Sequence, residues 1–523
     1  MNPVSANFRA LFLSVGLMSA STAFAANENG NPTSAPPPWA NGQGELQRQR
    51  AQLEGKVHRM EAALKARGYE VARGATKLFN IAECPYMIAV IGSCLGNNPT
   101  SPYIMPSVPL WPDEYADEGL QGLIGPLPNN TWATHRMDKR EAVLVFGLLP
   151  PPAKYFGIQS YIFSRKVAIN PNDPIYQATL GESVMHRIMF SPLPKSPERL
   201  MVFSSMGNSN NNVTIASQAG SAFNQQGAFV ISTDAALTRE MTDALVHARV
   251  TERNHVFAEP VPSSLARLGV GAAADDFMTL IRYAQPDDEN AAEAWRQQMP
   301  IAVLRVRDKN ANATEPYPTP VYDTKTARSE LGLADNLASL VSAIKQQWGQ
   351  AGATDTPFLS LQLWVDLVGQ HCLARPMSCL GDTQDADYQI GRTVIPDENT
   401  AIAVTGTLGT ATGNATYSSL SVNWLTVLEG VANVPDAVLQ GSASGFGGAV
   451  ANTDKFYVQY FARNCAGIAH CLTITEEMVP KGDPIKVIQR NYVVPGSARG
   501  ADPTQVLNPV TIILDRSTLA ASR

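Results

Sequence analysis

The chain has 523 residues, of which 44% are hydrophobic and 16% are charged, and its formal net charge is −6. This length allows about two to four domains with hydrophobic cores. Because the chain has no basic excess to neutralise phosphates, composition excludes a typical nucleic-acid-binding protein, and we expect no nucleic-acid partner.

The N-terminus has the pattern of a secretory signal peptide. Arg9 precedes an apolar stretch, and Ala23-Phe24-Ala25 supplies the small residues that signal peptidase recognises. We therefore expect residues 1–25 to be removed and the mature protein to be soluble, secreted or periplasmic, and without a membrane span. A retained N-terminal anchor is the alternative, although the apolar stretch is short for one.

Next come a tether and a helix. Residues 26–42 are rich in Pro and Asn, which predicts an extended segment. Residues 43–68 carry apolar side chains at heptad-like spacing, which predicts an amphipathic helix. This helix either packs on its own domain, the interpretation that we favour, or forms a coiled coil through which the protein oligomerises.

The remaining chain divides into three regions. Residues 69–233 and 351–523 have the alternation of β-strands, including a strand expected over 358–368. Residues 234–350 are predicted to be a helical region with one or two strands, with helices over 275–284, 288–298 and 326–348. This order predicts an α+β fold of two mainly antiparallel β domains with the helical region between them.

The two β regions share one pattern. From Glu141 to Ile169 and from Thr400 to Asn423, an alternating strand ends in Gly-x-Leu, and a turn-rich spacer then leads to a strand that bears tyrosine. We interpret this as a sign that the two β domains are duplicated and that the two segments occupy equivalent places.

The cysteines form three close pairs. They are Cys84 and Cys94, Cys372 and Cys379, and Cys465 and Cys471. Because exported proteins fold in oxidising surroundings and loop closure favours near neighbours, we predict these pairs as disulfides. Zinc is the alternative, but no pair has the Cys-x-x-Cys spacing of common zinc sites.

An acidic loop follows the second pair. Asp382, Asp385 and Asp387 could offer oxygen ligands to a structural calcium ion, although their spacing is not that of an EF-hand. The alternative, which we favour, is a solvated acidic turn held in shape by the Cys372–Cys379 disulfide. We expect no other cofactor.

Histidines supply the candidate catalytic groups. His371 and His470 each precede a cysteine, and the two could line one pocket with the acidic loop if their disulfides converge. His255 lies close to Glu252 after a predicted helix, where the two could act in catalysis or bind a metal. The stretch from Trp111 to Glu118 combines aromatic rings with carboxylates, a combination that also occurs in saccharide sites.

No familiar catalytic motif is present. The sequence lacks the Gly-x-Ser-x-Gly elbow, the His-Glu-x-x-His zinc motif and the Walker loop. Our first hypothesis is an exported hydrolase or lyase acting on an ester, a glycoside or a small organic molecule. The alternative is a non-catalytic ligand-binding or envelope-structural protein built from two β domains. A concave pocket with perturbed histidines or carboxylates would favour the enzyme.

Overall fold

The computed structural model describes residues 38–517 except 100, 121–126 and 311–312, and no side chain of 38–43 is described. The predicted signal peptide lies outside these residues. Helix α1, Pro38–Ala66, begins inside the predicted tether, so residues 38–42 are helical and not extended. The other α-helices are α2 Cys84–Ile91, α3 Pro174–Thr179, α4 Ser183–Met189, α5 Asn212–Ala219, α6 Ala235–His247, α7 Glu289–Gln298, α8 Ala334–Gln347, α9 Leu361–Trp364, α10 Gly369–Ala374, α11 Gly409–Thr412 and α12 Asp436–Leu439.

The strands form four mainly antiparallel sheets, numbered here in their spatial order, and with the helices they make an α+β fold. Sheet 1 has the order β1 Glu70–Arg73, β12 Ile301–Arg307, β4 Glu141–Leu148, β9 Gln226–Ser232 and β10 Val256–Pro260. Sheet 2 has the order β2 Ala75–Phe79, β3 Tyr103–Ser107, β11 Asp276–Pro286, β5 Ala153–Lys166, β7 Ser196–Ser205 and β6 Pro192–Leu193, and β8 Asn210–Asn211 also pairs with β5.

Sheets 3 and 4 belong to the C-terminal part of the chain. Sheet 3 has the order β14 Leu359–Ser360, β15 Ala386–Ile390, β21 Ile485–Tyr492, β17 Tyr417–Trp424 and β18 Glu429–Pro435. Sheet 4 has the order β13 Asp355–Pro357, β22 Val510–Asp515, β16 Thr400–Thr407, β19 Phe456–Ala462 and β20 Cys471–Thr473. We call residues 38–307 the first half and residues 331–517 the second half.

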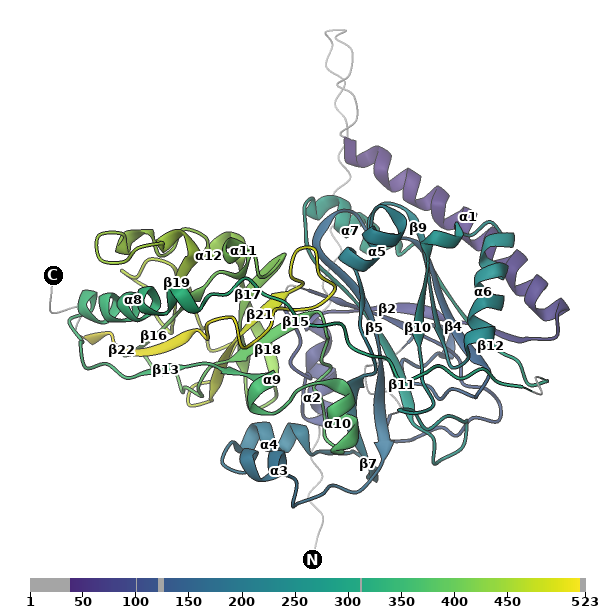
Figure 1. Cartoon of the computed structure of the whole chain (residues 1–523), viewed down its shortest axis with the longest axis horizontal. Helices are drawn as coiled ribbons and strands as arrows, with labels where there is room; N and C mark the ends of the chain where they lie inside the picture. Colours follow the sequence, from purple (N-terminus) through teal and green to yellow (C-terminus); the bar gives the residue numbers. More distant parts are fainter. Residues whose placement is uncertain (1–37, 100, 121–126, 311–312, 518–523) are drawn as a thin grey trace, which may run out of the picture.

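Each half is a β-sandwich with a helix on its outer sheet (Figure 1). Sheets 1 and 2 enclose one core, and sheets 3 and 4 enclose another. Leu53, Val57, Met60 and Leu64 of α1 are buried on the outer face of sheet 1. Helix α8 covers sheet 4 in the same way. The apolar stripe of α1 therefore packs on its own domain, as we favoured, and oligomerisation through it stays a prediction.

The two halves have the same strand topology. Sheets 1 and 4 each place four antiparallel strands in a row and add a fifth strand parallel to its neighbour. The common path of sheets 2 and 3 also agrees, with β2, β3, β11, β5 and β7 corresponding in chain order to β14, β15, β21, β17 and β18. In this correspondence β4 and β5 match β16 and β17. The segments Glu141–Ile169 and Thr400–Asn423, which contain these strands, therefore occupy corresponding places in the two topologies, as predicted. That the halves arose by duplication stays a prediction.

Three local predictions need correction. Residues 276–286 form strand β11 and not a helix, because the segment is central in sheet 2 and buried on both faces, which removes the period of a one-sided strand. Strand β14 covers only Leu359–Ser360 of the strand expected over 358–368, since Ser360 caps α9. The described residues of 234–350 hold three strands rather than one or two. These strands, β10, β11 and β12, complete the sheets of the first half.

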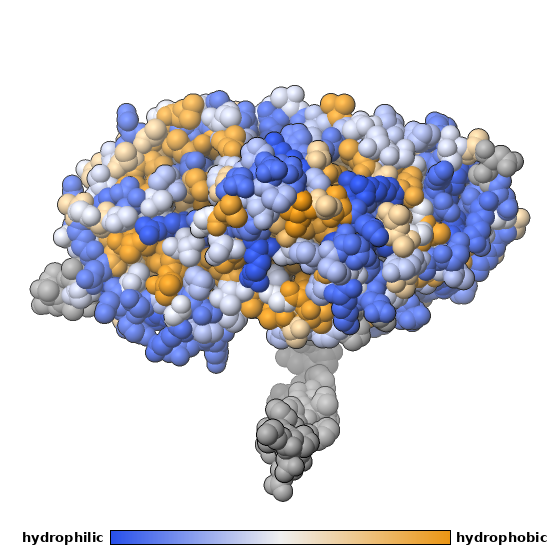
Figure 2. All heavy atoms as spheres, turned by 90° about the horizontal axis from the view of Figure 1, so that it is seen from below, coloured by the Kyte–Doolittle hydropathy of each residue, from blue (hydrophilic) through white to orange (hydrophobic). Residues whose placement is uncertain are grey.

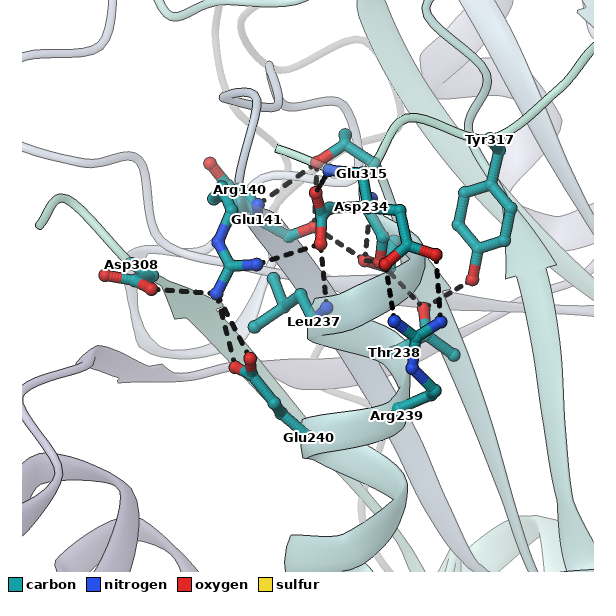
Figure 3. A network of polar contacts seen from close by, with 12 residues as sticks. Arg140, Glu141, Asp234, Leu237, Thr238, Arg239, Glu240, Asp308, Glu315 and Tyr317 are labelled. Carbon is teal, nitrogen blue, oxygen red and sulfur yellow. Dashed lines mark hydrogen bonds and ion pairs between the residues drawn. The ribbon is translucent and has the colours of Figure 1, made fainter. Parts of the chain in front are cut away.

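Helix α6 begins at a side-chain cap that belongs to a larger polar network. Asp234 accepts a hydrogen bond from the backbone N–H of Leu237 at 2.8 Å and pairs with Arg140 at 2.9 Å. Arg140 also pairs with Asp308 at 2.9 Å and with Glu240 at 3.3 Å (Figure 3). Because Asp308 directly follows β12, the network holds the start of the connection between the halves against α6.

No helix in the described ranges is long and apolar enough to cross a membrane. On the face seen from below in Figure 1, hydrophobic side chains lie in separate areas divided by hydrophilic ones (Figure 2). Tyr86 and Val90 of α2 and Leu363 of α9 are among the large hydrophobic side chains that remain exposed.

Candidate functional site

A cavity of about 120 Å³ lies where the two halves meet, between the outward faces of sheets 2 and 3. Strands β3, β11, β15 and β21 contribute to its wall, and helices α2, α4 and α9 close its sides. Most of the wall is apolar. Its polar side chains are Asn97, Tyr103, Arg282, Asp382, Tyr388, Arg490 and Tyr492.

Two loops from opposite halves reach the cavity, and they have nearly the same sequence. Ser-Cys-Leu-Gly occurs at 93–96 and again at 378–381. The backbone repeats as well, because φ is 57° at Leu95 and 56° at Leu380, and it is 67° at the glycine that follows each leucine. A left-handed leucine is uncommon, so the shared conformation is a specific feature of these loops.

The disulfides fix these two loops. Cys84–Cys94 ties the first to the start of α2, and Cys372–Cys379 ties the second to α10, with Cα separations of 5.1 and 5.7 Å. The third predicted disulfide, Cys465–Cys471, is present in the second half away from the cavity wall. All three predicted pairings are therefore present.

Strand register places two tyrosine–arginine pairs in corresponding positions. Tyr103 of β3 lies opposite Arg282 of β11, and Tyr388 of β15 lies opposite Arg490 of β21. Each tyrosine stands nine residues after the cysteine of its Ser-Cys-Leu-Gly loop. Since β3 corresponds to β15 and β11 to β21, each half presents the same pair of side chains to the cavity.

Each arginine reaches across to the loop of the other half. Nη2 of Arg282 donates to the carbonyl oxygen of Gly381 at 2.9 Å, and Nη2 of Arg490 donates to that of Gly96 at 3.2 Å. Nη1 of Arg490 also donates to the Ser421 hydroxyl. Both arginines are only 5% exposed, and neither forms an ion pair with a carboxylate in the described part of the chain. The cavity wall therefore holds two buried cations without a counter-ion.

The same loops are held by backbone hydrogen bonds. The N–H of Gly96 donates to the carbonyl of Leu428 at 2.8 Å, and the N–H of Gly381 donates to that of Phe203 at 2.9 Å. Leu428 and Phe203 also have positive φ, 46° and 32°. Each half thus embeds its loop in the other, and the loops that shape the cavity are fixed from both sides.

A second cavity of about 100 Å³ adjoins the first. Its wall includes the exposed residues Arg187 and Pro192. The residues that line both cavities are Leu95, Ile188, Phe203, Leu380 and Leu428. Four of these five have positive φ, so these left-handed positions lie where the two cavities adjoin.

Comparisons with known proteins give no family for this chain. No family model matches it, and no curated protein matches it. The crystal structure of an uncharacterized protein from Burkholderia cenocepacia is similar over 92% of this chain and 97% of its own length, with 11% sequence identity and a TM-score of 0.36. A likeness this weak supports no conclusion about function.

The acidic loop is not the solvated turn that we favoured, because Asp382, Asp385 and Asp387 are all buried. Asp382 accepts hydrogen bonds from the backbone N–H of Ser205 at 2.8 Å, from its hydroxyl at 2.6 Å and from the N–H of Gly369 at 3.1 Å. Burial raises the pKa of Asp382, and these hydrogen bonds oppose the rise. The sequence cannot show Ser205 as a partner, since it lies 177 residues away.

The other two aspartates have different surroundings. Asp385 accepts hydrogen bonds from the Tyr155 hydroxyl at 3.0 Å and from the side-chain amide of Asn211 at 3.1 Å. Neither carboxylate oxygen of Asp387 has a hydrogen-bond partner among the described residues, and burial raises its pKa to about 6 against the pull of Lys325. No group of three or more acidic, histidine or cysteine side chains in the described ranges is arranged to hold a metal ion, so the predicted calcium site is not supported.

The candidate histidines do not meet in the cavity. His371 is exposed, and its Nδ1 lies 2.8 Å from Asp366. His470 is exposed in the loop before β20, and Nδ1 of His255 lies 3.0 Å from the carbonyl of Gln226, the first residue of β9. Glu252 is exposed. The structure thus gives these residues no common site, because the two disulfides beside His371 and His470 pack in different hydrophobic clusters.

The acidic and aromatic stretch from Trp111 to Glu118 packs inside the first half. Glu114 pairs with Arg305 at 2.7 Å, and both side chains are almost fully buried. Asp113 pairs with Arg307 at 2.8 Å, and both arginines stack on the ring of Trp111. These carboxylates are held by arginines of β12, which explains the composition of the stretch without a saccharide.

Proposed function

We propose that the protein is an exported binding protein that takes one small, mainly apolar molecule into the cavity between its halves. The observation that carries this proposal is a hydrophobic cavity in which the charged wall residues, among those that the structure describes, are two arginines without an ion pair and the hydrogen-bonded Asp382. Export is supported by the three disulfides and by the signal-like N-terminus. The proposal includes a location outside the cytoplasm, in which the protein is either secreted or periplasmic.

The volume favours a ligand about the size of benzene. An engineered apolar cavity of about 150 Å³ binds benzene, and this cavity is slightly smaller. Met87, Met105, Met185 and Met278 line it, and methionine side chains adapt to the shape of a ligand.

An enzymatic role as a hydrolase or lyase stays a prediction. None of the described residues that line the cavity is a histidine, and its two cysteines are in disulfides. A binding role requires no acid, base or nucleophile in the cavity wall, so it fits the site better.

Toluene titration with methionine-methyl NMR tests the proposal. The methyl signals of the four cavity methionines should shift and reach a plateau as toluene is added. The signals of Met60 in α1 and Met241 in α6, which are buried against sheet 1, should not shift. Leu280→Phe narrows the cavity and should weaken the response at least tenfold. Leu144→Phe, in the core of sheet 1, is the matched control and should keep it. No shift at the cavity methionines with toluene or any other probe would refute the proposal.

A further inference from the structure

We propose that the ligand carries a carboxylate group, which Arg282 and Arg490 bind together. This inference rests on the proposed function and specifies the chemical class of the ligand as a small apolar molecule with one anionic group. It starts from the two cations in the cavity wall, because a buried guanidinium without a counter-ion is costly unless an anion compensates it.

Both arginines keep donor capacity for a ligand. Arg282 and Arg490 direct one Nη2 each at a loop carbonyl, and a guanidinium has more N–H groups than these contacts use. Arg463 shows the opposite case. It is also buried without an ion pair in the described ranges, but it donates to the carbonyls of Ile474, Thr475, Val479 and Pro480. Arg463 is therefore satisfied by the backbone. Arg282 donates to one carbonyl and faces the rings of Tyr103 and Tyr161, and Arg490 donates to one carbonyl and one hydroxyl, so both make fewer hydrogen bonds than Arg463.

The two arginines lie near the same phenol groups. Tyr388 and Tyr492 both line the cavity, and the positive charges of Arg282 and Arg490 act on each of them. Burial raises the pKa of both phenols, so they stay protonated at neutral pH and can donate hydrogen bonds. Tyr388 is opposite Arg490 in the strand register, and its ring centre lies 6.3 Å from that of Tyr492. The cavity wall thus holds two guanidinium groups and two phenols whose N–H and O–H groups can donate to an oxyanion.

The carboxylate of Asp382 does not neutralise the charges of Arg282 and Arg490. Its oxygens already accept hydrogen bonds from Ser205, Gly369 and the side chain of Gln384. It forms no ion pair with either cavity arginine in the described part of the chain. An incoming carboxylate can therefore take the place of the missing counter-ion.

The remaining wall selects against a bare anion. Met105, Leu280, Ile390 and Ile488 line it, and they offer no hydrogen bond to a solvated ion. A carboxylate attached to a hydrocarbon or aromatic body satisfies both parts of the cavity, because the body covers the apolar wall. Acetate or inorganic phosphate leaves that wall uncovered and should bind much more weakly.

Calorimetric titration of the intact mature protein with benzoate, benzamide and toluene, and with acetate as the bare anion, tests the inference. Benzamide has nearly the shape of benzoate without its charge. We expect benzoate to bind at least tenfold more tightly than benzamide and acetate to bind at least tenfold more weakly than benzoate. If toluene binds and benzoate binds with equal or lower affinity than toluene, the carboxylate inference is overturned and the proposed function stands. Binding of none of the three compounds would overturn both.

Arginine variants locate the anion. Arg282→Lys and Arg490→Lys keep a charge but lose the forked donors, so each should reduce benzoate affinity at least fivefold and leave toluene affinity within twofold. Arg463→Lys is the matched control for removing a buried arginine, and it should leave the ratio of benzoate to toluene affinity unchanged. An unchanged ratio in both cavity variants would refute the inference, and the comparison in the unmutated protein tests it even if a variant fails to fold.

Discussion

Arg282 and Arg490 are equivalent residues of the two halves, and each donates a hydrogen bond to a loop glycine of the opposite half. The relation is reciprocal, as in an interface with twofold symmetry, although both halves belong to one chain. It has two consequences. The loops that bring Gly96 and Gly381 into place determine both the contact between the halves and the shape of the cavity. Changes that displace either loop should therefore affect stability and ligand binding together.

The disulfides offer the first test of that coupling. Replacing Cys372 and Cys379 by alanine should lower the free energy of unfolding by about 2–3 kcal/mol, since the bond closes a short loop. It should also weaken toluene binding, because Cys379 lines the cavity. Replacing Cys465 and Cys471 should cost a similar stability and leave binding unchanged. Thermal melting and toluene titration of both double variants measure the two effects, and equal loss of binding in both would contradict the assignment.

Much of the fold could be predicted from local patterns. The apolar spacing of α1, the alternation of β4 and β16 and the close cysteine pairs all report contacts that are local or repeat along one element. Strand β11 was missed because a strand buried on both faces loses its alternation. The cavity was missed because its wall comes from distant parts of the chain. Arg490 donates to Gly96, 394 positions away, only after both halves have folded, and no local pattern shows that contact.

One sequence signal could have located the site. Ser-Cys-Leu-Gly at 93–96 and 378–381, each with a tyrosine nine residues after its cysteine, marks both loops and both strands that follow. The shared strand pattern marks β4 and β16 as equivalent but does not extend to these loops. The acidic loop was misjudged for a related reason, because the local sequence does not show buried partners such as Ser205 from the other half.

Asp382 should therefore matter far more than an exposed aspartate. Asp382→Ala leaves the Ser205 and Gly369 donors buried without an acceptor, so we expect a loss of about 3 kcal/mol or more in the free energy of unfolding. Asp454, which is exposed in the same half, provides the control, and Asp454→Ala should change stability by less than about 0.5 kcal/mol. Urea denaturation of both variants measures the difference. A change below about 1 kcal/mol for Asp382→Ala would show that these hydrogen bonds are dispensable.

Asp387 should make stability depend on pH. Burial raises its pKa from an ordinary 3.8 to about 6 in the folded protein. Between these values the unfolded chain releases a proton that the folded chain keeps, so this group destabilises the fold progressively as pH rises through that window. Asp387→Asn removes the effect. The free energy of unfolding of Asp387→Asn should equal that of the unmutated protein near pH 3.5. Above pH 6.5 it should exceed that of the unmutated protein by up to about 3 kcal/mol.

Denaturation at a series of pH values checks this window. Asp382→Asn is unsuitable as a control because it also breaks hydrogen bonds, whereas Asp454→Asn alters an exposed carboxylate in the same half and should show a nearly flat difference. A flat difference for Asp387→Asn as well would mean that the folded protein solvates or pairs this carboxylate.

Gly96 and Gly381 allow strain and steric fit to be separated. Both have φ of +67°, so alanine at either position costs about 1 kcal/mol for the left-handed backbone. A Cβ at position 96 would lie 3.7 Å from Leu428, which is ordinary contact. At position 381 it would lie 2.6 Å from the Phe203 ring, which is buried between Tyr161 and Phe163 with ring-centre distances of 4.9 and 5.1 Å.

Gly381→Ala should therefore be less stable than Gly96→Ala by about 1–3 kcal/mol, the usual cost of overpacking a core. Because Phe203 also lines the cavity, Gly381→Ala should weaken toluene binding, whereas Gly96→Ala should change it little. Chemical denaturation and toluene titration of the two variants provide the comparison. Equal losses in both would mean that the Phe203 ring can move aside and that the two loops differ less in packing than their contacts indicate.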